Sequence, residues 1–149
     1  AFLHIATDGT VSCYTGKIEM GQGIITSLAQ MMAEALNVPI AKVRMVMGDT
    51  DLCPYDAGTW CSLPTRAFGP AMRAAAAAAR TVMGQMASGN LGVAADRLEV
   101  ADGVIMESGS PSVRVSYAEL AQGRERERYL EITPVPEDFT KYTLVGEPL

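Results

Sequence analysis

The first quarter of the chain changes from the alternating pattern of β-strands to the period of an α-helix. Apolar-rich runs on either side of Asp8-Gly9, a dipeptide suited to the positive φ angles of a tight turn, predict a β-hairpin over 2–15. Over 24–36, apolar residues recur every three or four positions, which predicts a helix that ends at Asn37. The polar residues expected on the other side of this helix are Gln30, Glu34 and Asn37.

The rest of the chain repeats these two patterns. Alternating residues over 42–47 predict a short strand, and a loop-rich stretch then leads into a second helix over 65–86. A second hairpin is expected around Asp102-Gly103, and Ser116 with Glu119 three residues later is typical of a helix capping box. The order of these elements predicts an α+β fold in which a mixed β-sheet packs with two main helices.

Composition indicates a globular protein and excludes several classes of function. Of the 149 residues, 48% are apolar and 19% are charged, which is enough to build a packed core. A net charge of −5 lacks the basic surface of a protein held on nucleic acid, so nucleic-acid binding is not expected. Apolar stretches are interrupted before the roughly 20 residues of a membrane span, so no transmembrane segment is expected.

The most informative segment is the glycine-rich run over 16–23, which leaves a predicted strand and enters the first predicted helix. Gly21 and Gly23 allow backbone conformations that are closed to other residues, and the start of the helix is expected to present free N–H groups to an anion. Gln22 adds a neutral amide that can donate to an oxygen atom. The run suits a bound phosphate, oxo or enolate oxygen, and a glycine-rich turn with a solvated glutamine explains it equally well.

This run and the helix after it resemble the GxxExGQG segment of the molybdenum hydroxylases, the xanthine dehydrogenase and aldehyde oxidase family. Within that family, the pattern looks most like the molybdopterin-binding large subunit of the isoquinoline 1-oxidoreductase and nicotinate dehydrogenase type. The resemblance continues through 37–39, 43–50, 56–59 and 69–76. It implies a molybdopterin-binding segment with the GQG loop over 1–90, and a small α/β extension and linker toward the next domain over 91–149. The chain is therefore expected to be a piece of a longer polypeptide.

The resemblance also implies roles for residues of the glycine-rich run. The family glutamine that matches Gln22 hydrogen-bonds an oxygen ligand of the molybdenum, so Gln22 is the implied catalytic residue. The backbone that matches Gly21 and Gly23 lines the pterin cofactor, together with Gln22. No residue of this chain is implied as a direct metal ligand. Glu19 is expected to accept hydrogen bonds from the turn.

A second loop is implied to approach the same cofactor. Its cofactor-binding residues are Gly58, Thr59 and Ser62. Trp60 and Cys61 depart from the family pattern, in which a glycine follows a small or aromatic residue. Cys61 adds a Cβ where a close approach of the backbone is expected, so no cofactor contact is expected from Cys61 itself.

The implied reaction is hydroxylation of an N-heteroaromatic compound or an aldehyde with oxygen derived from water. The implied cofactors are molybdopterin, as its cytosine dinucleotide, with molybdenum, and iron–sulfur clusters on a small partner subunit. The other implied partners are the remaining domains of the same subunit and a small-molecule substrate. The family's catalytic glutamate lies in a part of the subunit with no counterpart here, so the chain alone is expected to be inactive.

Two alternatives stay open at this point. In the first, the chain is a non-catalytic assembly domain of such a complex with a degenerate cofactor loop, and Cys61 is the main support for it. In the second, the chain is a phosphate-binding module that uses only the start of its first helix. The sequence leaves the substrate, the electron acceptor and the cellular compartment open.

Overall fold

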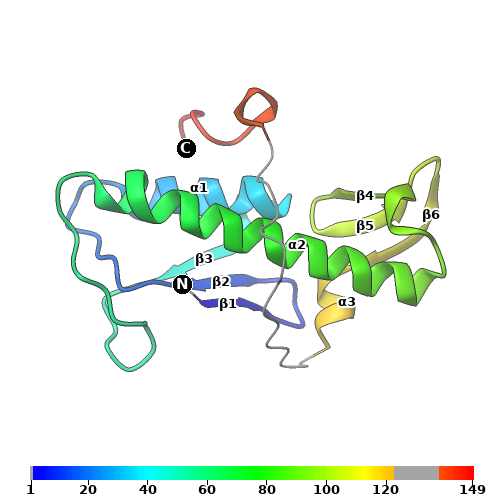
Figure 1. The fold of residues 1–149 in the computed structure, drawn as a ribbon, viewed down its shortest axis with the longest axis horizontal. Helices are drawn as coiled ribbons and strands as arrows, with labels where there is room; N and C mark the ends of the chain where they lie inside the picture. Colours follow the sequence, from blue (N-terminus) through cyan, green and yellow to red (C-terminus); the bar gives the residue numbers. More distant parts are fainter. Residues whose placement is uncertain (1, 123–137) are drawn as a thin grey trace.

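The structure is a computed structural model that describes residues 2–122 and 138–149. Its first β-sheet has the order β1 (Phe2–Ile5), β2 (Val11–Tyr14) and β3 (Val43–Val46). Strands β1 and β2 are antiparallel and form the predicted hairpin, whereas β2 and β3 are parallel (Figure 1). The parallel pair is connected through a helix, as such pairs require. The expected mixed sheet is confirmed.

Two long helices pack against each other. Helix α1 (Ile24–Leu36) packs on the first sheet, and helix α2 (Gly69–Leu91) packs against α1 and extends to the second sheet (Figure 1). Helix α1 has the predicted bounds, and Asn37 ends it with a φ of 54°. These two helices confirm the predicted α+β fold class.

The second helix begins and ends later than its pattern predicts. A π-helical turn over Pro64–Phe68 comes first, and α2 begins at Gly69, with Pro70 in its first turn. Proline lacks the N–H that a helix interior needs, so it is favoured at this position. The helix continues past residue 86 until Gly92, whose φ of 69° ends it.

A second, antiparallel sheet follows α2. It contains β4 (Leu98–Ala101), β5 (Val104–Glu107) and β6 (Ser110–Ser116), and the short helix α3 (Tyr117–Ala121) comes directly after it. The predicted hairpin and the predicted capping box between Ser116 and Glu119 are both confirmed. Strand β6 was not predicted, because its start, Ser-Pro-Ser, has the composition of a turn. Short 3₁₀ turns occupy Ile40–Lys42, Ala95–Arg97 and Phe139–Lys141.

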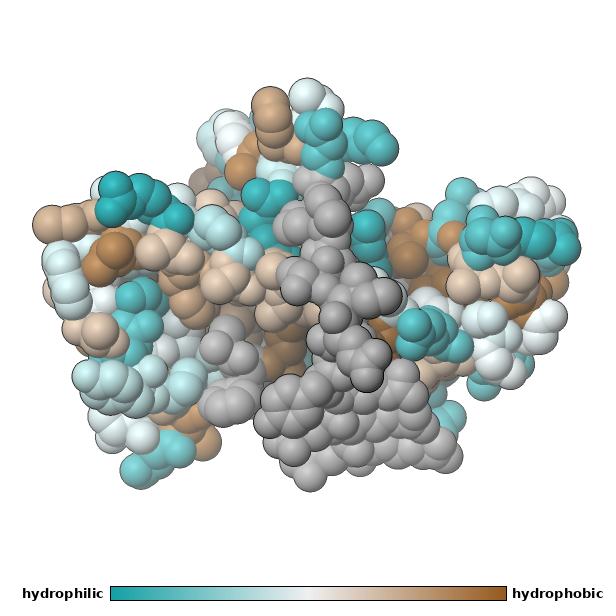
Figure 2. Space-filling model, in the orientation of Figure 1, coloured by the Kyte–Doolittle hydropathy of each residue, from teal (hydrophilic) through white to brown (hydrophobic). Residues whose placement is uncertain are grey.

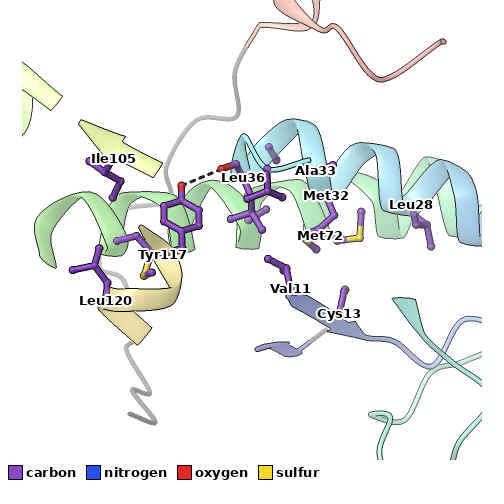
Figure 3. Packing of buried hydrophobic residues seen from close by; sticks show 14 of the residues in the cluster. Val11, Cys13, Leu28, Met32, Ala33, Leu36, Met72, Ile105, Tyr117 and Leu120 are labelled. Atoms are coloured by element: carbon purple, nitrogen blue, oxygen red, sulfur yellow. Dashed lines mark hydrogen bonds between the residues drawn. The ribbon is translucent and has the colours of Figure 1, made fainter. Parts of the chain in front are cut away.

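The hydrophobic core lies between the helices and the two sheets (Figure 3). Strand β2 contributes Val11 and Cys13, and burial raises the pKa of the Cys13 thiol to about 11. Within 2–122 and 138–149, no helix is both long and apolar enough to cross a membrane. The larger hydrophobic side chains of the core that are essentially inaccessible to solvent are Val11, Cys13, Leu28, Met32, Leu36, Met72, Ile105 and Tyr117.

The second sheet is joined to the end of α1 by hydrogen bonds. The Tyr117 hydroxyl donates to the Leu36 carbonyl at 3.0 Å (Figure 3), and the Gly103 amide donates to the Asn37 carbonyl at 2.8 Å. The Asn37 side-chain amide donates to the Val100 carbonyl at 2.8 Å. Burial raises the pKa of Tyr117, so the hydroxyl stays a proton donor.

The polar side of α1 is covered by the end of the chain. The Glu34 carboxylate accepts the amides of Thr143, Leu144 and Val145 at 2.6 to 3.0 Å. The side-chain amide of Gln30, a buried residue, donates to two carbonyls of the same segment, at Leu144 and Glu147. Burial by itself raises the pKa of Glu34, but these hydrogen bonds outweigh it and hold the pKa below its usual range.

We predict that Tyr117→Phe lowers the free energy of unfolding by about 1 to 2 kcal/mol, because the buried Leu36 carbonyl loses its donor. Urea denaturation followed by circular dichroism measures this change. Tyr55→Phe is the matched control, since Tyr55 is 94% exposed. Equal stability of the two variants would mean that the Tyr117 hydrogen bond does not hold the second sheet on α1.

Candidate functional site

Two loops lie side by side at one end of the molecule, on the left in Figure 1. The first loop, 15–23, connects β2 to α1, and the second loop, 47–63, connects β3 to the π-helical turn. Since β2 and β3 are parallel neighbours, their carboxyl ends meet at the same edge of the sheet. Both loops therefore leave the sheet from one place, which is where ligands bind in many α/β folds.

The backbone of the first loop lies directly against the second loop at Gly16. A Cβ at this position would collide with the Asp56 side chain and with the Pro54 carbonyl oxygen. Beside it, the Lys17 ammonium donates to Asp56 Oδ1 at 2.6 Å and to the Gly58 carbonyl at 2.7 Å. Glycine at position 16 is therefore needed for close contact of the loops rather than for a special φ angle.

Two further hydrogen bonds support this junction, one between the loops and one within the second loop. The Ile18 amide donates to Thr59 Oγ1 at 3.0 Å, and the Gly58 amide donates to Asp56 Oδ1 at 2.8 Å. Burial by itself raises the pKa of Asp56, but the hydrogen bonds from Lys17 and Gly58 outweigh it and hold the pKa below its usual range. Asp56 therefore stays ionised opposite the Lys17 ammonium at neutral pH.

Glu19 stabilises the turn into α1 from within the first loop. Its carboxylate accepts the amides of Gly21 at 2.7 Å, Gly23 at 3.0 Å and Ile25 at 3.0 Å. The hydrogen bonds from Ile25 and Gly23 hold the pKa of Glu19 below its usual range. The role expected for Glu19 as an acceptor for the turn is confirmed.

These contacts correct the expectation of free amides at the start of α1. The amides of Gly21, Gly23 and Ile25 already have an anionic partner in Glu19. The positive end of the helix is thus compensated by a carboxylate of the chain itself. This arrangement counts against a module that binds phosphate through this helix start alone.

Gln22 lies at the tip of the first loop and is exposed, as expected. Its side-chain oxygen accepts the Met20 amide at 2.5 Å, and its side-chain amide donates to the Ile18 carbonyl at 3.0 Å. A carboxamide carries two N–H donors, so the second one can serve a ligand. The side chain is therefore oriented by its own loop.

The loops enclose a pocket of about 730 Å³ that is open to solvent. Three of the six residues that the sequence analysis assigned to the cofactor, Gln22, Thr59 and Ser62, line it together. Figure 2 shows hydrophobic and hydrophilic residues intermixed on the surface at this end of the molecule. The full lining is Met20, Gln22, Ile24, Thr59, Trp60, Cys61, Ser62, Pro64, Thr65 and Arg66.

The three remaining assigned residues are glycines that are next in sequence to residues lining the pocket. Gly21 and Gly23 flank Gln22 with φ angles of 95° and 79°, and a Cβ at either would meet no other atom within 4 Å. Gly58 has a φ of 126° and lies against the Trp60 ring, with which a Cβ would collide. These three positions therefore shape the backbone around the pocket.

Trp60 and Cys61, which depart from the family pattern, both belong to the pocket lining. Trp60 is 52% exposed, and its ring packs on Gly58. Cys61 has a φ of 48°, in the left-handed region that favours glycine, and Ser62 after it has a φ of 59°. A glycine at position 61 would thus suit the backbone observed here, although the chain has a cysteine.

Sequence reasoning missed the junction between the loops and several lining residues. Lys17 and Asp56 are 39 residues apart, so no local pattern pairs them. Two features of the sequence could have indicated the pair. Lys17 lies between a strand and a glycine-rich turn, and Asp56 begins an Asp-x-Gly turn in the second loop. Arg66 lies in the π-helical turn and brings a cation to the pocket. Among the described residues, no group of three His, Cys, Asp or Glu side chains forms a metal site.

Comparison with known proteins identifies the family of the chain. Residues 1–142 match the family of molybdopterin cofactor-binding domains. The chain is 34% identical to a subunit of the nicotinate dehydrogenase of Pseudomonas putida over 145 residues, which are 97% of this chain and 12% of that protein. It is also 34% identical, over 123 residues, to the gamma subunit of the 6-hydroxypseudooxynicotine dehydrogenase complex of Paenarthrobacter nicotinovorans, covering 83% of this chain and 15% of that protein.

Solved structures share the fold. Reconstituted CO dehydrogenase from Oligotropha carboxidovorans matches with a TM-score of 0.71 and 30% identity, over 80% of this chain and 15% of that one. Quinoline 2-oxidoreductase from Pseudomonas putida 86 matches with a TM-score of 0.67 and 29% identity, over 79% and 15%. This chain spans less than a sixth of the length of any of these four relatives. It belongs to the molybdenum hydroxylase family, as a molybdopterin cofactor-binding domain.

Proposed function

We propose that this chain is the part of a molybdenum hydroxylase large subunit that holds one side of the molybdopterin cofactor. The enzyme as a whole would hydroxylate an N-heteroaromatic compound with oxygen derived from water. The observation that carries the proposal is the junction of the two loops, which brings Gln22, Thr59 and Ser62 into one pocket. An aldehyde substrate is the other reaction class that the family allows.

The pocket residues fit the chemistry of such a cofactor. Thr59 Oγ1 accepts the Ile18 amide and keeps its own proton to donate, and Ser62 offers a further hydroxyl. Arg66 supplies a cation for a phosphate group of the dinucleotide. The open space beside Gly21 and Gly23 leaves room for a ligand close to the backbone.

When bound, the molybdenum cofactor supplies the redox chemistry of the hydroxylation. Met20 and Ile18 hold the Gln22 carboxamide in place, and its second amide N–H would donate to the cofactor and orient it. Glu19 fixes the backbone on both sides of Gln22 through Gly21 and Gly23. Thr59 and Ser62 would hold the polar part of the cofactor through their hydroxyl groups. The chain would thus orient the cofactor and supply hydrogen bonds to it.

The names of the relatives favour an N-heteroaromatic substrate. Nicotinate and quinoline, which appear in the names of two of them, are N-heteroaromatic compounds. We also propose that the cofactor is the cytosine dinucleotide form and that iron–sulfur clusters on a small partner subunit take up the electrons. In this account, 1–90 form the cofactor-binding segment, and 91–149 form the extension and linker toward the next domain of the subunit.

A non-catalytic assembly domain is the second candidate. Cys61 favours it, because its side chain lines the pocket at a position where the backbone suits glycine. Molybdenum and pterin analysis of the intact complex separates the two candidates. A cofactor-loaded complex with turnover supports the first candidate, whereas a complex without pterin supports the second.

We predict that the 149-residue chain, purified alone, holds no molybdenum. Its pocket is open to solvent, and the chain contributes only a small part of the subunit length seen in relatives. Elemental analysis of the purified chain measures this. One molybdenum atom per chain would show that the missing segments are not needed to hold the cofactor.

We predict that Gln22→Ala in the intact complex lowers kcat by about 10²- to 10³-fold at matched molybdenum content, because one donor aimed at developing charge is lost. The fold is expected to tolerate the change, since Gln22 is exposed and buries no apolar area. Gln85→Ala, an exposed glutamine on α2, is the control and should keep full turnover. Unchanged kcat in Gln22→Ala would remove Gln22 from the mechanism, and a collapse of metal content would make its role structural.

A further inference from the structure

Lys17 is a buried charged residue at the centre of the junction between the loops. The residue is 7% exposed, and its ammonium donates to Asp56 Oδ1 at 2.6 Å and to the Gly58 carbonyl at 2.7 Å. A buried ammonium is costly unless it is paired and hydrogen-bonded. Lys17 also lies outside the hydrophobic core cluster. The Lys17 side chain therefore joins the first loop to the second loop.

The contacts of Lys17 fix both polar groups of Gly58. The Gly58 carbonyl accepts directly from Lys17, and the Gly58 amide donates to Asp56 Oδ1, the atom that Lys17 also binds. Gly58 holds a φ of 126°, which is open only to glycine. The Trp60 ring packs directly on this glycine. The Trp60 ring therefore rests on Gly58, and Gly58 is in turn held by Lys17 and Asp56.

We propose that Lys17 is a positioning residue that sets the Thr59–Trp60 wall of the cofactor pocket relative to Gln22. The inference rests on the proposed function, because it assigns the pocket to the cofactor. Lys17 acts through Asp56 and Gly58, and the Ile18 amide next to it holds Thr59. Gln22 follows five residues after Lys17 in the same loop, so one side chain links both sides of the pocket.

The chain offers a direct probe of this wall, since Trp60 is its only tryptophan. Quenching of Trp60 fluorescence by acrylamide measures the exposure of the ring in the 149-residue chain without any cofactor. The test variants are Lys17→Met and Asp56→Ala, each of which removes one partner of the Lys17–Asp56 ion pair. Lys17→Arg keeps the charge and the donors. Lys42→Met is the matched control, because the Lys42 ammonium donates to the Asp8 carbonyl at the hairpin turn.

We expect the quenching constant to rise about twofold in Lys17→Met and in Asp56→Ala, because a half-exposed ring on a released loop becomes almost fully exposed. The quenching constant of the double variant should be no higher than that of either single variant, since both substitutions remove the same Lys17–Asp56 interaction. Lys17→Arg should lie between Lys17→Met and the unaltered chain. Lys42→Met should leave quenching unchanged.

Two results would overturn the inference. The first is unchanged quenching in either of the two variants that folds by circular dichroism. The second is loss of the fold in both variants, which would make Lys17 a determinant of the core rather than of the pocket wall.

The cofactor is tested separately in the intact subunit. There, Lys17→Met should lower the molybdenum-to-protein ratio, while Lys42→Met should not. If quenching rises but the unaltered subunit carries no molybdopterin, the positioning role stands and the proposed function fails. If the unaltered subunit is loaded and Lys17→Met keeps full loading with unchanged KM and kcat, the wall does not act on the cofactor and the inference fails.

Discussion

The close approach of the first loop to the second is the constraint on which the site depends. Gly16 leaves the space for Asp56 and for the Pro54 carbonyl, and Lys17 fills the junction with a paired charge. Without this contact, nothing in the parallel pairing of β2 and β3 would keep the two loops at a fixed separation. A buried ion pair of this kind contributes less to net stability than to a defined geometry, and geometry is what a cofactor pocket requires.

Two other carboxylates of the chain, Glu19 and Glu34, also accept several backbone amides, one near each end of α1. Glu19 compensates the helix start and fixes the turn around Gln22, and Glu34 holds the segment 143–145 on the polar side of the helix. In both cases an anion of the chain accepts several backbone amides that would otherwise need water or a ligand. Helix α1 is thus in contact with both the first loop and the last described segment. A rigid support at this position suits a domain that presents one loop to a cofactor.

The elements that could be predicted are those whose signal is local. Helix α1 was predicted with its observed bounds because an apolar period and Asn37 coincide at its end, and the capping box of Ser116 contains both of its partners within four residues. Strand β6 was not predicted, because its polar start gains strand structure only from pairing with β5. Gln22, Thr59 and Ser62, which the sequence grouped, line one pocket, and their roles toward a cofactor stay predictions. The Lys17–Asp56 pair is a contact between distant residues, which spacing cannot show.

The central claim is that contact between the loops makes the cofactor pocket. The most direct test is the molybdopterin content of the intact subunit with Gly16→Ala, compared with Gly84→Ala, where a Cβ on α2 meets no other atom within 4 Å. The added methyl group at position 16 should separate the loops and lower the cofactor content of the subunit to a small fraction of that of the unaltered subunit. Gly84→Ala should keep full content. Full loading of a folded Gly16→Ala subunit would contradict the claim.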